Sequence, residues 1–348
     1  MKRVGLLSYS SNTGLGIQTK EFYDHMEPTK TLVADLEKWN GMETHHKWYP
    51  DGRVCRDMPS QEEMDWLVDG IDVLFVCETP LKYYLFEKAN EKGVKIIQQL
   101  NPEFWDYFRE PHLSKPTILA NPSTWMFDSI NAQNIAPMRY WPVPTNRKNI
   151  PFRKIDKVET IIHIIGRPTA GDRNGTMEFL EAIKTIGNEY KYIVYLQPPR
   201  DSRARQFFEP VRQKIEETQK MVDIEIKTDL PKYTDLYKDG DILVLPRKYG
   251  GLCLPMQESL AAGIPVIMTD TSPNDRRLPI EWLADTESAG SFFAHTTIDL
   301  YKARIESLID RIYYVIDNIK EANKEADKLA HGNSWEVLTS KYYQWINE

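Results

Sequence analysis

The sequence contains few cysteines, no long apolar run and no excess of positive charge. Its three cysteines, Cys55, Cys77 and Cys253, lie far apart and form no CxxC pair. This argues against a disulfide framework or a zinc site and favours a reducing cytoplasm. No stretch reaches the roughly 18 apolar residues of a membrane span, and the opening MKRVGLLSYSSNTG is too polar for a secretory signal. We therefore predict a cytoplasmic protein without a membrane span.

Acidic residues outnumber basic ones, and the formal net charge is -7. This excludes a protein that coats nucleic acid through its overall charge, although a local basic groove stays compatible with it. A chain of 348 residues is too long for one ordinary core and suits two domains. The content of 41% apolar and 27% charged residues is typical of a globular protein.

The first part of the chain alternates strands and helices. Compact apolar strands are predicted at 3–10 (RVGLLSYS) and 71–78 (IDVLFVCE). The glycine loop SNTGLG and a helix over 17–26 follow the first strand, and a helix over 80–93 follows the second. The segments VKIIQQL and PTILAN add two short strands. This order predicts an open α/β sheet of the Rossmann-like type.

The alternation stops around 142–158, where PVPTNRKNIPFRKIDK holds three prolines and has no regular period. We interpret 146–157 as a linker that follows an N-terminal domain of residues 1–145. A long surface loop is the alternative. A second Rossmann-like domain is predicted over 158–325.

The second part repeats the same pattern. Strands are predicted at VETIIHIIG, YKYIVYLQ, DIEIKT, DILVLP and IPVIMTD. Helices are predicted at 174–187 and over SRARQFFEPVRQKIEETQKMV. The tail, 296–330 and 334–348, is predicted to be helical throughout.

The stretch YGGLCLPMQESLAAGIPVIMTD carries the first candidate site. Pro255 suits the first turn of a helix and Gly263 its end, so a short helix is predicted over 255–262. The free N–H groups at its start suit an anion, and the preceding loop lets a ligand approach the backbone. Glu258 lies about one turn in, where it would either accept hydrogen bonds from sugar hydroxyls or complement the helix dipole. The predicted donor-binding residues of this stretch are Gly250, Gly251, Leu252, Cys253 and Glu258.

A second stretch, IIHIIGRPTAGDRNG, places two arginines near the carboxyl end of a strand. Ligands of parallel sheets bind at this end of the strands. Arginine is always charged and can hold a phosphate through two parallel hydrogen bonds. We predict that Arg167 and Arg173 hold a diphosphate and act as catalytic residues by stabilising its departing charge. Two unrelated surface arginines are the alternative.

With these motifs in hand, the chain resembles GT-B glycosyltransferases of the glycosyltransferase family 4 type. That family shows Gly-Arg after the first strand of its second domain and a Lys shortly after. Later it shows Glu-Gly-Phe-Gly-Leu-Pro-x-x-Glu-Ala and then Gly-x-Pro-Val-Ile. Here Gly166 and Arg167 match the first pair, and Arg173 stands one residue beyond the Lys. The later motif matches at Leu254, Pro255, Glu258, Gly263, Pro265, Val266 and Ile267.

The resemblance is strong over 158–270 and weak over 27–115. The first-domain SNTGLG is similar to the family's glycine loop, so Gly14 and Gly16 are donor-binding candidates. LANPSTW at 119–125 is similar to a strand and turn of that domain. The end SWEVLTSKYYQW resembles the family's closing helix, which implies that 326–348 packs back on the N-terminal domain.

The resemblance implies two Rossmann-like domains with a cleft between them and a glycosyltransferase that uses a nucleotide-sugar donor. UDP-sugar is the favoured donor, retention is implied at the anomeric carbon, and no cofactor or metal is expected. The chain departs from the family at Gly250, where the first of two glutamates usually contacts the donor sugar. The family's first-domain histidine aligns with none of His25, His45, His46 and His112.

Two other functions stay open on the same fold, namely a nucleotide-sugar epimerase and a non-catalytic binder of sugar nucleotides. The acceptor is a further hypothesis. The motif is similar to a branch found in bacterial viruses, in which some enzymes glycosylate hydroxymethylated pyrimidines in DNA. A cell-envelope or small-molecule acceptor is the alternative. Basic residues that would bind DNA are Arg147, Lys148, Arg153, Lys154, Arg200, Arg203, Arg205, Arg276 and Arg277. FWDYF at 104–108 would stack on a flipped base.

Overall fold

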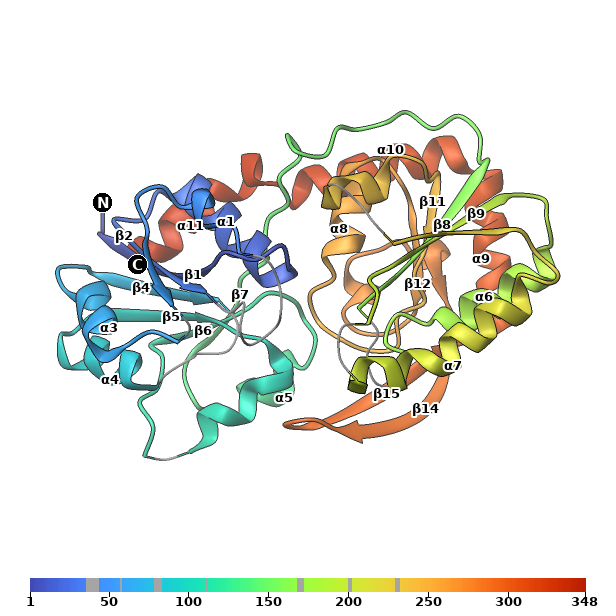
Figure 1. The fold of residues 1–348 in the computed structure, drawn as a ribbon. Helices are drawn as coiled ribbons and strands as arrows, with labels where there is room; N and C mark the ends of the chain where they lie inside the picture. Colours follow the sequence, from blue (N-terminus) through green and yellow to red (C-terminus); the bar gives the residue numbers. More distant parts are fainter. Residues whose placement is uncertain are drawn as a thin grey trace. The chain divides into compact units, whose positions relative to one another are not determined.

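A computed structural model describes residues 1–35, 44–56, 58–77, 83–110, 112–167, 172–199, 202–228 and 232–348. The contacts within the chain divide it into two units (Figure 1). Unit 1 comprises Met1–Pro144 together with Trp335–Glu348, and unit 2 comprises Thr145–Ser334.

Unit 1 is built on a seven-stranded sheet in the order β3-β2-β1-β4-β5-β6-β7, and all of its pairs are parallel. Its central strands are buried along their length because helices cover both faces of a parallel sheet. The strands are β1 (Val4–Tyr9), β2 (Lys30–Asp35), β3 (Arg53–Arg56), β4 (Val73–Cys77), β5 (Lys95–Gln99), β6 (Ile118–Asn121) and β7 (Met138–Tyr140).

The helices of unit 1 connect these strands and include the last helix of the chain. They are α1 (Gly14–Met26), α3 (Gln61–Val68), α4 (Tyr83–Glu91), α5 (Phe127–Asn131) and α11 (Trp335–Asn347), with 3-10 turns η1 (His46–Trp48) and η2 (Pro102–Arg109). Trp335, Leu338 and Tyr342 lie on one face of α11 at helical spacing and are buried. They share a core with Phe22 of α1 and Phe75 of β4, so the C-terminal helix is part of unit 1.

Unit 2 contains a six-stranded parallel sheet in the order β10-β9-β8-β11-β12-β13. The strands are β8 (Thr160–Gly166), β9 (Lys191–Leu196), β10 (Ile224–Lys227), β11 (Ile242–Val244), β12 (Val266–Thr269) and β13 (Leu283–Ala284). A separate antiparallel hairpin is formed by β14 (Thr286–Phe293) and β15 (Thr297–Ala303). The parallel α/β organisation predicted from the sequence is confirmed in both units.

The helices of unit 2 are α6 (Thr176–Ile186), α7 (Ser202–Thr218), α8 (Leu254–Ala261), α9 (Ile305–Asp317) and α10 (Ile319–Gly332). Short 3-10 turns lie at η3 (Tyr233–Tyr237), η4 (Asn274–Arg276) and η5 (Ile280–Trp282). The short helix predicted at 255–262 is α8, with Pro255 in its first turn. Its chain enters from β11 and leaves to β12, the sheet neighbour of β11.

Two local predictions were wrong. Residues 297–303, predicted to be helical, form strand β15, in which Ile298 and Leu300 are buried on either side of the exposed Asp299. This alternation is a short strand signal that the helical prediction overlooked, whereas the partner strand β14 is almost entirely exposed and shows none. The predicted glycine loop SNTGLG is partly helical, because α1 begins at Gly14 with Thr13 as its N-cap.

The first segment of unit 1 ends at Pro144, one residue before the predicted bound, whereas unit 2 (145–334) extends beyond the predicted 158–325 at both ends. Residues 146–157, interpreted as a linker, fall in unit 2, where Ile150 and Ile155 are buried in the core. Ala326 and Ala330 of α10 lie in the same core, so the chain enters unit 1 only at Trp335.

Candidate functional site

The candidate site lies at the carboxyl edge of the unit 2 sheet. β11 lies between β8 and β12, and all three run parallel, so their carboxyl ends open on the same edge. The loop after β8 leads to α6, and the loop after β11 leads to α8. Parallel α/β sheets bind ligands at this edge, and both predicted motifs fall on these two loops.

The loop after β8 carries the two predicted arginines. Arg167 directly follows β8 and is exposed. Asp172 accepts hydrogen bonds from the backbone N–H groups of Thr176 (3.0 Å) and Met177 (2.9 Å), which caps the start of α6. The guanidinium of Arg173 lies over the ring of Tyr249, 4.8 Å from its centroid. This cation–π contact attaches Arg173 to the other loop.

The two loops meet along a backbone and side-chain seam. The N–H of Lys248 donates to the carbonyl of Arg173 (2.8 Å). The Lys248 ammonium, which is buried, contacts the carboxylates of Glu178 (3.1 Å) and Asp172 (3.4 Å). Burial raises the pKa of Glu178, while the Lys248 charge opposes that rise. The seam therefore fixes where Arg173 lies relative to the loop after β11.

The β14–β15 hairpin also contacts the loop after β11. The N–H of Tyr301 in β15 donates to the carbonyl of Lys248 (3.1 Å). Phe292 in β14 makes an edge-on contact with Tyr249, with 5.1 Å between ring centroids. Tyr249 thus lies in contact with both Phe292 and Arg173.

Gly250 lies where the two loops approach most closely. Its φ of +113° disfavours any residue with a side chain. A Cβ placed there would lie 2.4 Å from Nη2 of Arg173 and 2.6 Å from Nη2 of Arg247. A side chain at position 250, including the glutamate expected from the family resemblance, would therefore need a strained backbone and a shift of the two guanidinium ends.

The remaining loop residues lead into α8. Cys253 is the N-cap position of α8 and makes no side-chain capping bond. The carbonyl of Leu252 accepts a hydrogen bond from Nη1 of Arg247 (3.0 Å). Gly251 and Cys253 are buried beside it. The predicted donor-binding residues of this loop thus form one continuous segment that meets Arg173 at Gly250.

Glu258 lies in the second turn of α8 and is buried. Its Oε2 accepts a hydrogen bond from the hydroxyl of Tyr237 (2.6 Å). Burial, followed by the Glu258 charge, raises the pKa of Tyr237 well above its usual value, so the hydroxyl keeps its proton. The first turn of α8 holds no acidic residue, and helix-dipole effects fade beyond the first turn. This position disfavours the interpretation of Glu258 as a residue that only complements the helix dipole.

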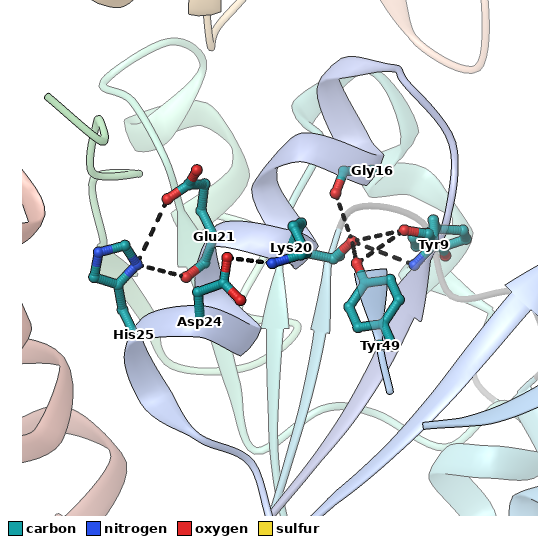
Figure 2. Close-up of polar contacts among 8 residues, drawn as sticks. Tyr9, Gly16, Lys20, Glu21, Asp24, His25 and Tyr49 are labelled. Carbon is teal, nitrogen blue, oxygen red and sulfur yellow. Dashed lines mark hydrogen bonds and ion pairs between the residues drawn. The ribbon is translucent and has the colours of Figure 1, made fainter. Parts of the chain in front are cut away.

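Gly14 and Gly16 belong to unit 1 and occupy the first turn of α1. A Cβ on Gly16 would lie 1.8 Å from the carbonyl oxygen of Ser11, so only glycine fits there. One turn later, the hydroxyl of Thr19 donates to the carbonyl of Gly16 and contacts Tyr49 and the backbone of Tyr9. Figure 2 shows Gly16 beside Tyr9 and Tyr49. Local packing explains Gly16, and its predicted role toward a donor stays a prediction.

The unit 1 histidines have contacts within their own unit. His25 stacks on Trp335 with 4.4 Å between centroids and lies near the Glu21 carboxylate (3.5 Å; Figure 2). His45 stacks on Trp48, and His46 lies 3.3 Å from Asp35. None of these contacts identifies a catalytic histidine.

Sequence reasoning missed three residues of this site, namely Arg247, Lys248 and Tyr249. They come directly after the apolar segment DILVLP, at the carboxyl end of β11. The criterion that selected Arg167, a cation just beyond a parallel strand, would have selected Arg247 and Lys248 as well.

Among the residues that the structure describes, no group of three or more His, Cys, Asp or Glu side chains is arranged to hold a metal ion. In the same described ranges, the helices are all too short or too polar to cross a membrane.

Comparison with known proteins finds a matching family model and several similar structures. Residues 156–325 match the family model described as glycosyl transferases group 1, and no curated protein matches the chain. Sucrose-phosphate synthase from Thermosynechococcus elongatus has a similar structure, at 12% identity and a TM-score of 0.68 over 100% of this chain and 98% of that chain.

Two further solved structures are similar over nearly their whole length. A glycosyltransferase from Rickettsia africae ESF-5 aligns at 13% identity and a TM-score of 0.69, over 99% of this chain and 98% of that chain. Anabaena HepE in complex with UDP and glucose aligns at 8% identity and a TM-score of 0.71, over 100% of both chains. Residues 156–325 thus match the glycosyl transferases group 1 model, and the chain has the GT-B fold of the glycosyltransferase structures to which it is similar.

Proposed function

We propose that unit 2 binds a nucleoside-diphosphate sugar and that the protein transfers its sugar to an acceptor hydroxyl. The observation that supports this most directly is the position of Arg173. Its guanidinium is held over Tyr249 and beside Gly250, at the edge of the sheet where the chain enters α8. A fixed cation near a helix start suits a diphosphate.

In the proposed reaction, the bond between the anomeric carbon and the diphosphate oxygen breaks, and the acceptor oxygen forms a new bond to that carbon. The proton of the acceptor hydroxyl passes to the departing diphosphate or to water, and the nucleoside diphosphate leaves with the electron pair of the broken bond. Arg167 and Arg173 would stabilise the charge that develops on the leaving group. The resemblance to the family supports retention at the anomeric carbon.

Glu258 is proposed to hold the donor's sugar hydroxyls, with the ribose as the first candidate. A carboxylate can accept several hydrogen bonds, and Glu258 lies one turn into α8, close to the loop after β11. Tyr237 fixes the carboxylate in one orientation, because its own hydroxyl stays protonated.

UDP is the first nucleotide to test. Three of the similar solved structures are of Anabaena HepE with UDP, with UDP and glucose, or with UDP-glucose. We also propose that the reaction needs no metal, because the two arginines and the start of α8 would supply the positive charge. Three buried free cysteines support the proposed cytoplasmic location.

The acceptor in DNA stays a sequence-based prediction. Several of the basic residues predicted to bind DNA form ion pairs inside unit 2. These pairs are Arg147 with Asp327, Arg153 with Asp241 (3.3 Å) and Lys154 with Asp156 (3.3 Å). Arg200 lies outside the described residues, as do the side chains of 107 and 108 in the aromatic run. Cell-envelope and small-molecule acceptors therefore enter the same screen as DNA.

The test is a panel of nucleotide sugars scored by thermal shift, followed by product analysis with the donor that binds. A bound donor raises the melting temperature by mass action on the folded state. Transfer requires an acceptor, epimerisation does not, and a binder yields no product. If no nucleoside diphosphate or nucleotide sugar stabilises the protein, the proposed donor site is wrong.

The acceptor is then identified by mass spectrometry or by radiolabel from that donor. DNA with hydroxymethylated pyrimidines is compared with unmodified DNA, and both are compared with oligosaccharide and small-molecule acceptors. Label in the hydroxymethylated DNA alone would support the DNA acceptor. Absence of label from every such DNA, with a donor that binds, would exclude it.

A further inference from the structure

Two guanidinium groups from distant parts of the sequence converge beside Gly250. The Nη2 atoms of Arg173 and Arg247 lie 2.4 Å and 2.6 Å from the position that a Gly250 Cβ would occupy. These two nitrogens are therefore no more than about 5 Å apart, which is the scale at which one phosphate can accept hydrogen bonds from both.

Both arginines are fixed by the fold. Arg247 is 8% exposed, and its Nη1 donates to the carbonyl of Leu252 (3.0 Å). Its backbone carbonyl accepts from the hydroxyl of Thr269 in β12, and its N–H donates to the carbonyl of Leu245 (2.7 Å). Arg173 is held by Tyr249 and by the Lys248 N–H. The convergence is therefore built into the fold.

The convergence places two positive charges where one dianion can contact both. Like charges at this separation repel, and burial of Arg247 reduces the screening by water. A dianion that contacts both groups turns this repulsion into attraction. Guanidinium groups suit that role because they stay charged and donate through a planar fork.

We propose that Arg247 and Arg173 form a clamp for a phosphate group and that Gly250 keeps the space between them open. The clamp rests on the proposed function, in which the phosphate belongs to the diphosphate of the nucleotide donor. Arg247 is then a donor-binding residue and acts together with Arg173. The absence of a side chain at position 250 is part of the same arrangement.

A purely structural role for Arg247 makes a different prediction. If Arg247 only braced the loop through Leu252, its loss would weaken binding of the nucleoside and of the nucleoside diphosphate equally. A phosphate contact instead affects only the diphosphate and free pyrophosphate. The ratio of the two affinities therefore separates the roles.

The experiment measures binding of UDP, ADP and GDP, of the matching nucleosides and of inorganic pyrophosphate to the full chain by calorimetry. We expect Arg247→Gln to weaken nucleoside-diphosphate and pyrophosphate binding at least tenfold, with nucleoside binding within twofold of wild type. Arg247→Lys keeps the charge, so its affinity for nucleoside diphosphates should lie between those of wild type and Arg247→Gln. Arg212→Gln, at an exposed arginine of the same unit that pairs with Glu209, is the matched control and should match wild type.

A second variant tests the same clamp at Gly250, between the two guanidinium groups. Gly250→Ala places a methyl group against both guanidinium groups and should reproduce the loss of diphosphate binding. It also keeps the test usable if Arg247→Gln fails to fold.

The outcomes separate the clamp from the proposed function. If wild type binds a nucleoside diphosphate and Arg247→Gln binds it equally well, or loses nucleoside and diphosphate alike, the clamp is wrong and the donor site survives. If wild type binds pyrophosphate through these residues but no nucleoside diphosphate, the clamp stands and the proposed function falls. Binding of neither pyrophosphate nor a nucleoside diphosphate overturns both.

Discussion

The two units share a parallel α/β design but differ at the carboxyl edges of their sheets. In unit 2 the loops at this edge carry charge, with Arg173 and Arg247 converging on Gly250. In the described part of the unit 1 edge, buried neutral groups stand near the strand ends, among them Ser10, Gln98 and Asn121. The loops after β8 and β11 thus present guanidinium groups, whereas the ends of β1, β5 and β6 present neutral hydrogen-bonding groups, and Asp35 at the end of β2 is paired with His46.

The family match lies in the unit whose sheet edge carries the guanidinium groups. It covers 156–325, which lies within unit 2 and includes both loops of the proposed donor site. A charged ligand such as a diphosphate needs cations, glycines and a helix start in a fixed arrangement. If unit 1 binds neutral hydroxyls instead, many combinations of Ser, Asn and Gln would serve, and its sequence pattern would be weaker.

The largest effect on ligand binding is expected when the cations that distinguish unit 2 from unit 1 are removed. The double variant Arg167→Ala, Arg173→Ala should lose about 3–6 kcal/mol of nucleoside-diphosphate binding, since two charged hydrogen-bonding groups are removed. The measurement is calorimetry together with the ligand-induced shift in melting temperature. Arg139→Ala removes an exposed cation of unit 1, paired with Glu348, and should leave binding unchanged. Equal binding by the double variant would show that the phosphate site lies elsewhere.

The next effect concerns the stability of unit 2 in acid. His163 in β8 donates from Nδ1 to the carbonyl of Val244 (2.7 Å) and accepts from the hydroxyl of Thr176 (3.0 Å). Burial lowers the pKa of His163 from 6.5 to about 4, so the fold favours the neutral ring. Its contribution is present above pH 6.5 and is lost as the pH falls toward 4. The loss amounts to about 3 kcal/mol.

Hydrogen exchange at the amides of β8 and β11, measured from pH 7 to pH 4.5, checks this prediction. His163→Gln keeps a donor for Val244 without a titratable ring and should flatten the acid-dependent loss of protection in unit 2. His25→Gln removes an imidazole from unit 1 instead and should leave the loss in unit 2 as in wild type. An identical pH dependence in His163→Gln and wild type would contradict the assignment.

A smaller effect is expected at Glu258. Glu258→Ala should weaken nucleotide-sugar binding by roughly 1–3 kcal/mol while the fold persists, because a charged hydrogen-bonding group is lost. Tyr237→Phe removes the bond that Tyr237 donates to Glu258 but keeps the carboxylate, so it should weaken binding less than Glu258→Ala does. If Glu258→Ala binds the donor as tightly as wild type, Glu258 has a structural role only.

The smallest effect on donor affinity is expected at Gly16, which the sequence assigned to donor binding. Gly16→Ala should destabilise unit 1 by about 1–3 kcal/mol, because its Cβ would collide with the Ser11 carbonyl, and should leave nucleoside-diphosphate affinity unchanged. Gly332→Ala, where a Cβ meets nothing within 4 Å, is the control for stability. A marked drop in affinity for Gly16→Ala at temperatures where unit 1 is folded would restore the donor-binding assignment.

The sequence alone determined the elements with a strong local signal. The buried strands around 4–9, 73–77 and 160–166 are short apolar runs bounded by turn residues, and α8 carries Pro255 at its start and Gly263 after its end. The sequence also selected Arg173, Gly250 and Glu258, because strand ends and helix starts in parallel sheets mark ligand sites. These features depend on residues close together in the chain.

Only the tertiary structure decided the features that depend on contacts between distant segments. Arg173 and Arg247 lie on separate loops, and their convergence on Gly250 follows from the adjacency of β8 and β11 in the sheet. Likewise, 297–303 becomes a strand because β14 pairs with it, although the sequence favoured a continuous helix. Local sequence patterns report which residues face a core, whereas strand order and pairing follow from how the whole chain packs.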